Sequence, residues 1–102
     1  MQVAKYAVVL AMLSGCGARS GDEACEADCK QAADCGIETP QPCESGCKAW
    51  LHKASEACEA SYVTLIACGE DFTCAQLQRV QSGDFGSCAS EMGQVVEDCP
   101  IP

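Results

Sequence analysis

The sequence has 102 residues, with 11 Cys, 15 Asp and Glu, six Lys and Arg, and one His. This length allows a single domain, and a net charge of −9 argues against a nucleic-acid partner or adsorption to an anionic lipid surface. Because about one residue in nine is Cys and only 5% are aromatic, the chain is expected to rely on disulfides in place of a large apolar core.

The first 16 residues carry the pattern of an export signal. Lys5 is followed by an unbroken apolar run, Tyr6 to Leu13, which as a helix would span only about 12 Å and could not cross roughly 30 Å of hydrocarbon. The next residues, Leu13-Ser14-Gly15-Cys16, resemble the lipobox of bacterial lipoproteins, in which an aliphatic residue and two small residues precede an invariant Cys. In that family the Cys sulfur receives a diacylglycerol and signal peptidase II cuts just before it. The resemblance therefore implies that Cys16 is the lipidated mature terminus.

This resemblance divides the chain into a cleaved signal peptide (1–15), a lipidated terminus with a short tether (16–21) and a disulfide-rich helical domain (22–102). It implies a cell-envelope protein held to the membrane by acyl chains, palmitate among them, on Cys16. Gly17 stands where the best-known inner-membrane retention signal has Asp, which favours the outer membrane in a cell with two membranes. The alternative is an ordinary secretory signal peptide that happens to contain a Cys.

Helical periodicity runs through the rest of the chain. The range 22–35 is preceded by Ser20, which with Glu23 predicts a capping box, and Gly36 is expected to end this helix. The segment 36–42 (GIETPQP) follows as a turn. An apolar stripe at steps of three or four then predicts one long helix over 42–68, with Pro42 in its first position.

Two shorter helices complete the predicted domain. Gly69 ends the long helix, and Thr73 with Gln76 predicts a capping box at the start of a short helix that ends near Gln81. The turn SGDFGS separates it from a last helix over 88–99. No segment alternates with a period of two for long enough to predict a strand, so the expected fold is all-α, with about four helices joined as disulfide-stapled hairpins.

The cysteine spacings predict nested pairs. With Cys16 assigned to lipid, ten Cys remain, and this even number fits five disulfides in an exported protein. Two C-x3-C pairs place their Cys on one face of each of two helices. An antiparallel hairpin would join the outer Cys of one helix to the outer Cys of the other and the inner Cys to the inner Cys, as in α-hairpinin peptides, which this segment resembles. A C-x9-C and a C-x10-C pair nest in the same way and resemble twin C-x9-C helical hairpins. The expected disulfides are Cys25–Cys47, Cys29–Cys43, Cys58–Cys99 and Cys68–Cys88, with Cys35–Cys74 left by elimination.

The fifth pair conflicts with a straight helix over 42–68. Such a helix would place Cys35 and Cys74 roughly 40 Å apart by helical rise, whereas a disulfide needs Cα atoms within about 7 Å. Either the long helix breaks, with the range 53–55 as the expected place, or this pairing is wrong.

Few residues suggest chemistry. The sequence contains no C-x2-C, the spacing that structural zinc sites and thioredoxin-like redox sites favour, so neither a metal site nor a cofactor is expected. His52 is the only His, and the nearby Lys48 and Lys53 would make it a poor general base, so we expect a surface His. Trp50 and Tyr62 are expected to pack in the core, with an exposed binding patch as the alternative. Four acids could collect Ca²⁺ but are expected to form a solvated face: Glu56, Glu59, Glu97 and Asp98.

The whole mature chain resembles the small Cys-rich helical lipoproteins of some bacteria, a likeness that implies location and fold. The expected function is that of a lipid-anchored, non-enzymatic envelope protein with a structural or protein-binding role. Its expected partners are the membrane, through the acyl chains on Cys16, and an envelope protein. The alternatives are an α-hairpinin-like protease inhibitor or secreted effector that presents the segment 36–42, and a metal-binding carrier.

Overall fold

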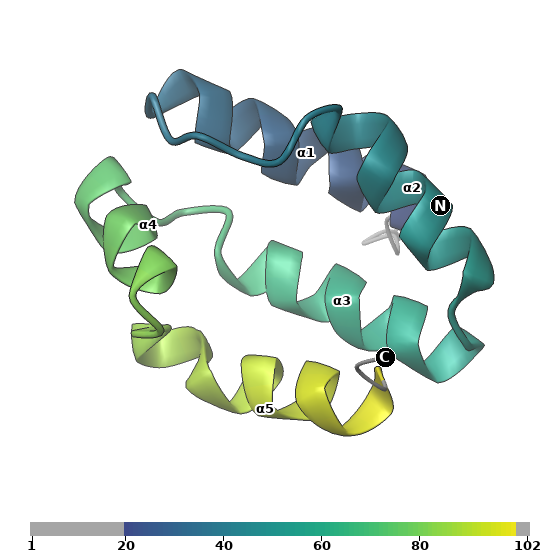
Figure 1. The fold of residues 1–102 in the computed structure, drawn as a ribbon. Helices are drawn as coiled ribbons and strands as arrows, with labels where there is room; N and C mark the ends of the chain where they lie inside the picture. Colours follow the sequence, from purple (N-terminus) through teal and green to yellow (C-terminus); the bar gives the residue numbers. More distant parts are fainter. Residues whose placement is uncertain (1–19, 100–102) are drawn as a thin grey trace, which may run out of the picture.

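The computed structural model describes residues 20–99 as a helical domain, and no strand occurs in that range (Figure 1). The expected all-α class is therefore confirmed. Five α-helices and one short 3-10 helix follow one another along the chain: α1 (Gly21–Asp34), α2 (Cys43–Lys53), α3 (Glu56–Cys68), α4 (Cys74–Gln81), η1 (Gly86–Cys88) and α5 (Ala89–Asp98).

The single long helix expected over 42–68 is wrong, because the chain forms two helices there. Ala54 has extended backbone angles (φ −83°, ψ 161°), and it ends α2. Ser55 then caps α3, since its Oγ accepts a hydrogen bond of 3.1 Å from the backbone N–H of Cys58. Ser is among the preferred residues at this capping position, so Ser55 starts a new helix rather than continuing the old one. The break falls within the range 53–55 that the Cys35–Cys74 pairing required.

The other helix ends follow the local sequence closely. Both expected capping boxes are confirmed, one of Ser20 with Glu23 at α1 and one of Thr73 with Gln76 at α4. Gly36 adopts a left-handed conformation (φ 69°) directly after α1, which only glycine adopts without strain. Pro42 differs from expectation, because it is the extended residue before α2 and not its first helical residue.

The helices lie side by side in the order α2, α1, α3, α5, with α4 across one end (Figure 1). Two disulfides hold α1 antiparallel to α2, and two more hold α3 antiparallel to the segment formed by η1 and α5. Helices α1 and α3 run in the same direction. Their starts meet where the backbone N–H of Gly21 donates to Oε2 of Glu59 (3.1 Å), and their ends meet where Nε2 of Gln31 donates to the carbonyl of Gly69 (3.0 Å).

All ten described cysteines form disulfides, with Cα–Cα distances of 4.8 to 6.0 Å. The pairs are the five expected from the nested spacings and from elimination: Cys25–Cys47, Cys29–Cys43, Cys35–Cys74, Cys58–Cys99 and Cys68–Cys88. Cys35 and Cys74 can pair, at a Cα–Cα distance of 5.3 Å, because the chain turns back at Ala54 and Ser55.

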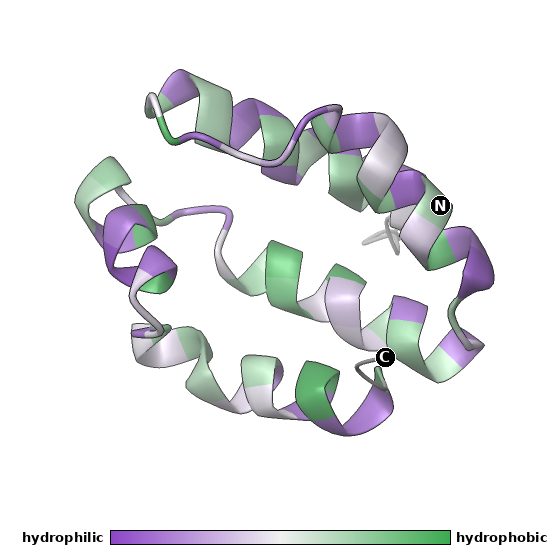
Figure 2. Ribbon diagram, in the orientation of Figure 1, coloured by the Kyte–Doolittle hydropathy of each residue, from purple (hydrophilic) through white to green (hydrophobic). Residues whose placement is uncertain are grey.

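The buried core is small and rich in sulfur. Nine hydrophobic residues are buried, and five of them are half-cystines. One cluster consists of Ala24, Cys25, Leu51 and Tyr62, and the second of Cys58, Val95 and Cys99. Figure 2 shows that the hydrophilic residues of α3 gather at its start, while hydrophobic residues follow along the rest of the helix. Several of these are only half-buried, and they form the feature described next.

Candidate functional site

An apolar groove of about 390 Å³ lies along α3. We call this feature the apolar groove and define it by its lining residues, which come from all five α-helices and the segments that flank α4. These residues are Asp28, Gln31, Trp50, Tyr62, Leu65, Ile66, Gly69, Phe72, Leu77, Val80, Phe85, Cys88, Met92 and Val95.

Helix α3 supplies one part of the lining and α5 supplies another. Leu65 and Ile66 are half-buried on α3, and Met92 is half-buried on α5, beside the buried Val95. These residues also pack against the two core clusters, so the same side chains serve the core and the groove. The groove is therefore a part of the core that the domain itself leaves uncovered.

Helix α4 and its flanking segments close one end of the groove with four half-buried side chains, Phe72, Leu77, Val80 and Phe85. The disulfide Cys35–Cys74 fixes the first residue of α4 to the end of α1. This bond places the apolar side of α4 against the groove although α4 contributes no residue to either core cluster.

Trp50 and Tyr62 meet where α2 faces α3. Their ring centroids are 5.6 Å apart and the ring planes are nearly perpendicular, at 86°, an edge-to-face arrangement that aromatic pairs prefer. Tyr62 is buried, as expected for a core residue, whereas the side chain of Trp50 is 41% exposed. Tyr62 therefore fits the expectation of core packing, whereas Trp50 fits the alternative of an exposed position, which here lies at the groove.

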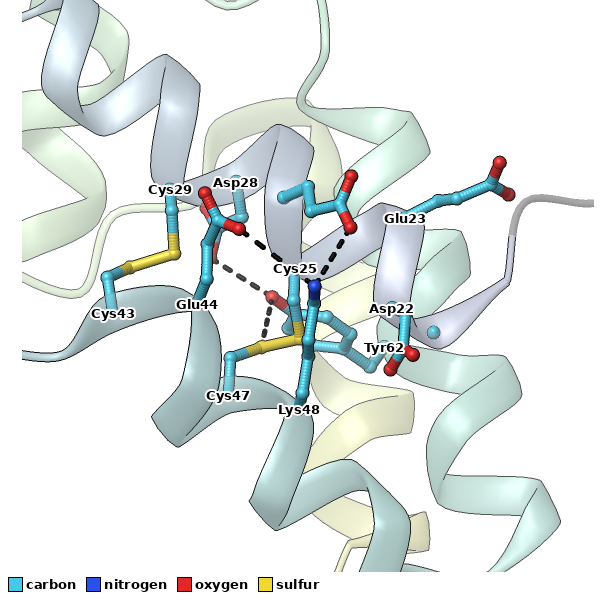
Figure 3. The surroundings of a disulfide bond; sticks show 12 residues. Asp22, Glu23, Cys25, Asp28, Cys29, Cys43, Glu44, Cys47, Lys48 and Tyr62 are labelled. Atoms are coloured by element: carbon cyan, nitrogen blue, oxygen red, sulfur yellow. Dashed lines mark hydrogen bonds and ion pairs between the residues drawn. A yellow bond between two sulfur atoms is a disulfide. The ribbon is translucent and has the colours of Figure 1, made fainter.

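Asp28 is the one charged residue among the described residues that line the groove, and it is hydrogen-bonded to Tyr62 (Figure 3). The Tyr62 hydroxyl donates a hydrogen bond of 3.1 Å to Oδ2 of Asp28 and lies 3.3 Å from Sγ of Cys47. Burial raises the pKa of the Asp28 carboxyl, and the hydrogen bond from Tyr62 opposes that rise. Burial also raises the pKa of Tyr62, and the neighbouring Asp28 charge and the hydrogen bond to it raise that pKa further.

Two basic residues of α2, Lys48 and His52, lie beside acidic side chains rather than in the groove. Nζ of Lys48 lies 2.9 Å from Oε2 of Glu26 and 3.9 Å from Oε1 of Glu44 (Figure 3). His52 is exposed, as expected, and its Nε2 lies 3.0 Å from Oδ1 of Asp22. The contacts of Lys48 with Glu26 and of His52 with Asp22 join α2 to α1. Neither Lys48 nor His52 lines the groove.

The four acids considered for calcium do not form one site. The Glu59 carboxylate accepts a hydrogen bond from Gly21, and the Asp98 carboxylate accepts hydrogen bonds from Ser61 and from Gln94 (3.0 Å). These two hydrogen bonds hold the pKa of Asp98 below its usual value. Glu56 and Glu97 are exposed. Within residues 20–99, no group of three His, Cys, Asp or Glu side chains is placed to hold a metal ion.

The expected lipidation site and its surroundings lie outside the described residues. This holds for the apolar run, for the lipobox-like residues with Cys16, and for all of the expected tether except Ser20 and Gly21. Across the described range 20–99, no helix is both long enough and apolar enough to span a bilayer.

Reasoning from the sequence missed most of the groove. It selected Trp50 and Tyr62, but not Asp28 or the apolar residues around α4. A signal was nevertheless present, because Phe72 and Phe85 flank a helix of only eight residues that also carries Leu77 and Val80. Four large apolar residues in and beside so short a helix indicate an apolar surface at this part of the chain.

We compared the chain with protein-family models, with curated proteins and with solved structures, and nothing matches it in any of the three comparisons.

Proposed function

We propose that this chain is a lipid-anchored, non-enzymatic protein of the cell envelope that binds another protein through the apolar groove. The observation that carries the binding role is the groove itself, in which half-buried Leu, Ile, Phe, Val and Met side chains lie open over about 390 Å³. A small domain with few large apolar residues gains stability by burying them, so apolar surface left open in a groove is typical of an interaction site.

The chemistry of the lining favours binding over catalysis. Among the described residues, the lining contains no His, Ser, Thr, Lys or Arg, and its one Cys is Cys88, which is bonded to Cys68. A nucleophile or a general base would have to come from such side chains, from a carboxylate or from a Tyr hydroxyl, and burial raises the pKa of Tyr62, the one Tyr of this lining. Asp28 is the one carboxylate of this lining, and its oxygen accepts the hydrogen bond of Tyr62.

The anchor rests on the sequence Leu13-Ser14-Gly15-Cys16 and on the apolar run before it. The five disulfides support export, because disulfides form and persist in oxidising compartments. From Cys16 to Ser20 the chain can span at most about 14 Å, so an acylated Cys16 would keep the domain close to the membrane surface. Gly17 favours sorting to the outer membrane in a cell with two membranes.

The anchor is tested by metabolic labelling with palmitate, followed by detergent partition of the wild type and of Cys16→Ser. We expect label and detergent partition in the wild type and the loss of both in Cys16→Ser. Equal label in the two proteins would show that Cys16 is an ordinary cysteine and would contradict the anchor.

The binding role is tested in the envelope by photo-crosslinking from defined positions. A photoreactive amino acid replaces Leu77 in the groove, and in a matched control it replaces Val96, which is 55% exposed on α5 and lies outside the groove. We expect a discrete crosslinked product from position 77 and none from position 96. The same product from both positions, or no product from either, would contradict a binding role for the groove.

A second candidate function is protease inhibition through the segment 36–42. The residues on either side of it, Cys35 and Cys43, are both in disulfides, and such fastening presents a loop in one fixed conformation. Assays against a panel of proteases, with a Glu38→Ala variant as control, test this alternative. The absence of inhibition at micromolar concentration would exclude it.

A further inference from the structure

The first clue to the occupant of the apolar groove is the kind of surface that surrounds it. The groove is lined by helices, and residues 20–99 contain no strand, so this surface offers no sheet edge to which an extended peptide could add. Among the modes by which proteins bind a segment, the one that suits an apolar groove between helices is an amphipathic helix that inserts its apolar side chains between the lining helices. A volume of about 390 Å³ suits a few such side chains.

The second clue is electrostatic. All 15 acidic residues of the chain lie within the described range, together with only four basic ones, Lys30, Lys48, Lys53 and Arg79. Two of these four are already paired with acids of the domain, Lys30 with Asp34 and Lys48 with Glu26. The domain as a whole therefore attracts cations and repels anions.

The third clue lies inside the groove, where a carboxylate and an exposed aromatic ring occur in the same lining. Asp28 is half-buried, and in the described structure no basic side chain shares the lining with it. Trp50 contacts Tyr62, whose hydroxyl is bonded to Asp28, so the indole and the carboxylate are linked through a single residue. Both groups favour a cationic side chain in the groove, the carboxylate by charge and the indole by a cation–π contact.

We propose that the apolar groove binds a cationic amphipathic helix of a partner protein, with its apolar residues against α3, α4 and α5 and a Lys or Arg near Asp28 and Trp50. This inference rests on the proposed protein-binding function and specifies the partner. The apolar volume alone would also accommodate the acyl chain of a lipid. An anionic lipid headgroup would, however, meet Asp28 and the acidic surface of the domain, so the charge favours the cationic helix.

Trp50 supplies the readout, because it is the only Trp of the chain and it lines the groove. The full-length chain carrying Cys16→Ser is titrated with three synthetic peptides of about 16 residues without Trp, long enough to form a helix on binding. The first peptide has a Leu face and a Lys face, the second has Glu in place of Lys, and the third contains the residues of the first in a scrambled, non-amphipathic order. Neutral dodecyl maltoside below its micelle concentration serves as the acyl-chain probe.

We expect a saturable change in Trp50 emission with the Leu–Lys peptide, at least about tenfold weaker binding of the Leu–Glu and scrambled peptides, and a loss of affinity with added salt. Asp28→Asn should weaken the binding of the Leu–Lys peptide severalfold. Because the assay uses Cys16→Ser throughout, its result does not depend on lipidation.

A matched set of variants ties the binding to the groove. Leu77→Glu and Leu77→Lys remove the same apolar side chain but add opposite charges, at a position of α4 that belongs to neither core cluster. Leu77→Lys should weaken the binding of the Leu–Lys peptide more than Leu77→Glu does. Val96→Gln, a change on the exposed part of α5, should leave binding unchanged.

The outcomes separate this inference from the function on which it rests. Equal or tighter binding of the Leu–Glu peptide, lost in both Leu77 variants, would overturn the cationic partner and leave a protein-binding groove. A saturable change in Trp50 emission with dodecyl maltoside, together with no binding of any peptide, would overturn both, and it would assign the groove to acyl chains. Peptide binding that neither the Leu77 variants nor Asp28→Asn alter would place the interaction elsewhere and would also overturn the inference.

Discussion

The hydroxyl of Tyr62 and the carboxylate of Asp28 lie 3.1 Å apart, and their hydrogen bond joins α3 to α1 at the edge of the apolar groove. This bond satisfies two polar groups that would otherwise be costly to bury. The carboxylate gains a donor where it has lost part of its water, and the buried phenol gains an acceptor.

Tyr62→Phe should destabilise the domain by about 1–3 kcal/mol, because it removes the donor and leaves the half-buried carboxylate of Asp28 without it. The free energy of unfolding is measured by urea denaturation of the oxidised protein. The control is the same substitution in an Asp28→Ala background, where no carboxylate remains to lose its donor and the cost should be smaller. An equal cost in the two backgrounds would show that the hydrogen bond contributes nothing to stability.

Asp28→Asn should raise stability near neutral pH and have little effect in acid. Because burial raises the pKa of Asp28 above its ordinary value of 3.8, the folded domain favours the protonated carboxyl. The contribution of protonated Asp28 to the stability of the folded domain is fully present below its ordinary pKa. It is lost as the pH rises through the raised pKa of Asp28 in the folded domain. Thermal melting of both proteins at about pH 3 and about pH 7 should therefore give a Tm difference only at the higher pH.

The matched control for this pH dependence is Glu38→Gln, which also removes one negative charge but lies at an exposed position of the segment 36–42. A Tm difference as large for Glu38→Gln as for Asp28→Asn would mean that net charge, and not burial of Asp28, causes the effect.

Complete reduction should abolish cooperative unfolding of the domain. Five of the nine buried hydrophobic residues are half-cystines, so the core loses its cross-links when the disulfides are reduced. Each bridge typically contributes about 2–4 kcal/mol, whereas the net stability of a domain is only about 5–15 kcal/mol. Circular dichroism during heating with excess dithiothreitol checks this, and a sigmoidal melt of the fully reduced protein would contradict it.

The double variant Cys35→Ser/Cys74→Ser should loosen α4 and spare the paired helices. This disulfide fixes the start of α4 to the end of α1, and the residues of α4 belong to neither core cluster. Amide hydrogen exchange should therefore lose protection in α4 while α1, α3 and α5 keep theirs. Loss of protection in all helices at once would show that α4 is part of one cooperative unit with the rest.

Local sequence rules were sufficient for most of the fold. Ser20 with Glu23 and Thr73 with Gln76 satisfy capping rules that involve only neighbouring residues, and the structure forms both boxes. The two disulfides between α1 and α2 follow from helix geometry, because their Cys lie four residues apart on each helix and share a face. The capping role of Ser55 was missed. The apolar stripe continues in phase through α2 and α3, so periodicity predicted one helix where there are two.

The groove could be predicted only in part, because it depends on how distant helices pack. Nothing near Asp28 in the sequence indicates that the hydroxyl of Tyr62, 34 positions away, will be its partner. The same holds for the residues around α4, which reach the groove because Cys74 is bonded to Cys35. Periodicity in the sequence can predict which residues share one face of one helix. It cannot predict this groove, whose lining comes from five helices.

The arrangement of the five disulfides has a consequence for proteolysis. Two bridges lie wholly before Ala54 and two lie wholly after Ser55, so Cys35–Cys74 alone cross-links the two halves of the described domain. Together with the backbone between Cys35 and Cys74, which includes the link at Ala54 and Ser55, this bridge closes a covalent ring through α2 and α3. A protease that cut at Ala54 would open the ring without releasing a fragment. Separation of the halves would require a cut and a reductant together, so a nicked molecule could keep its groove intact.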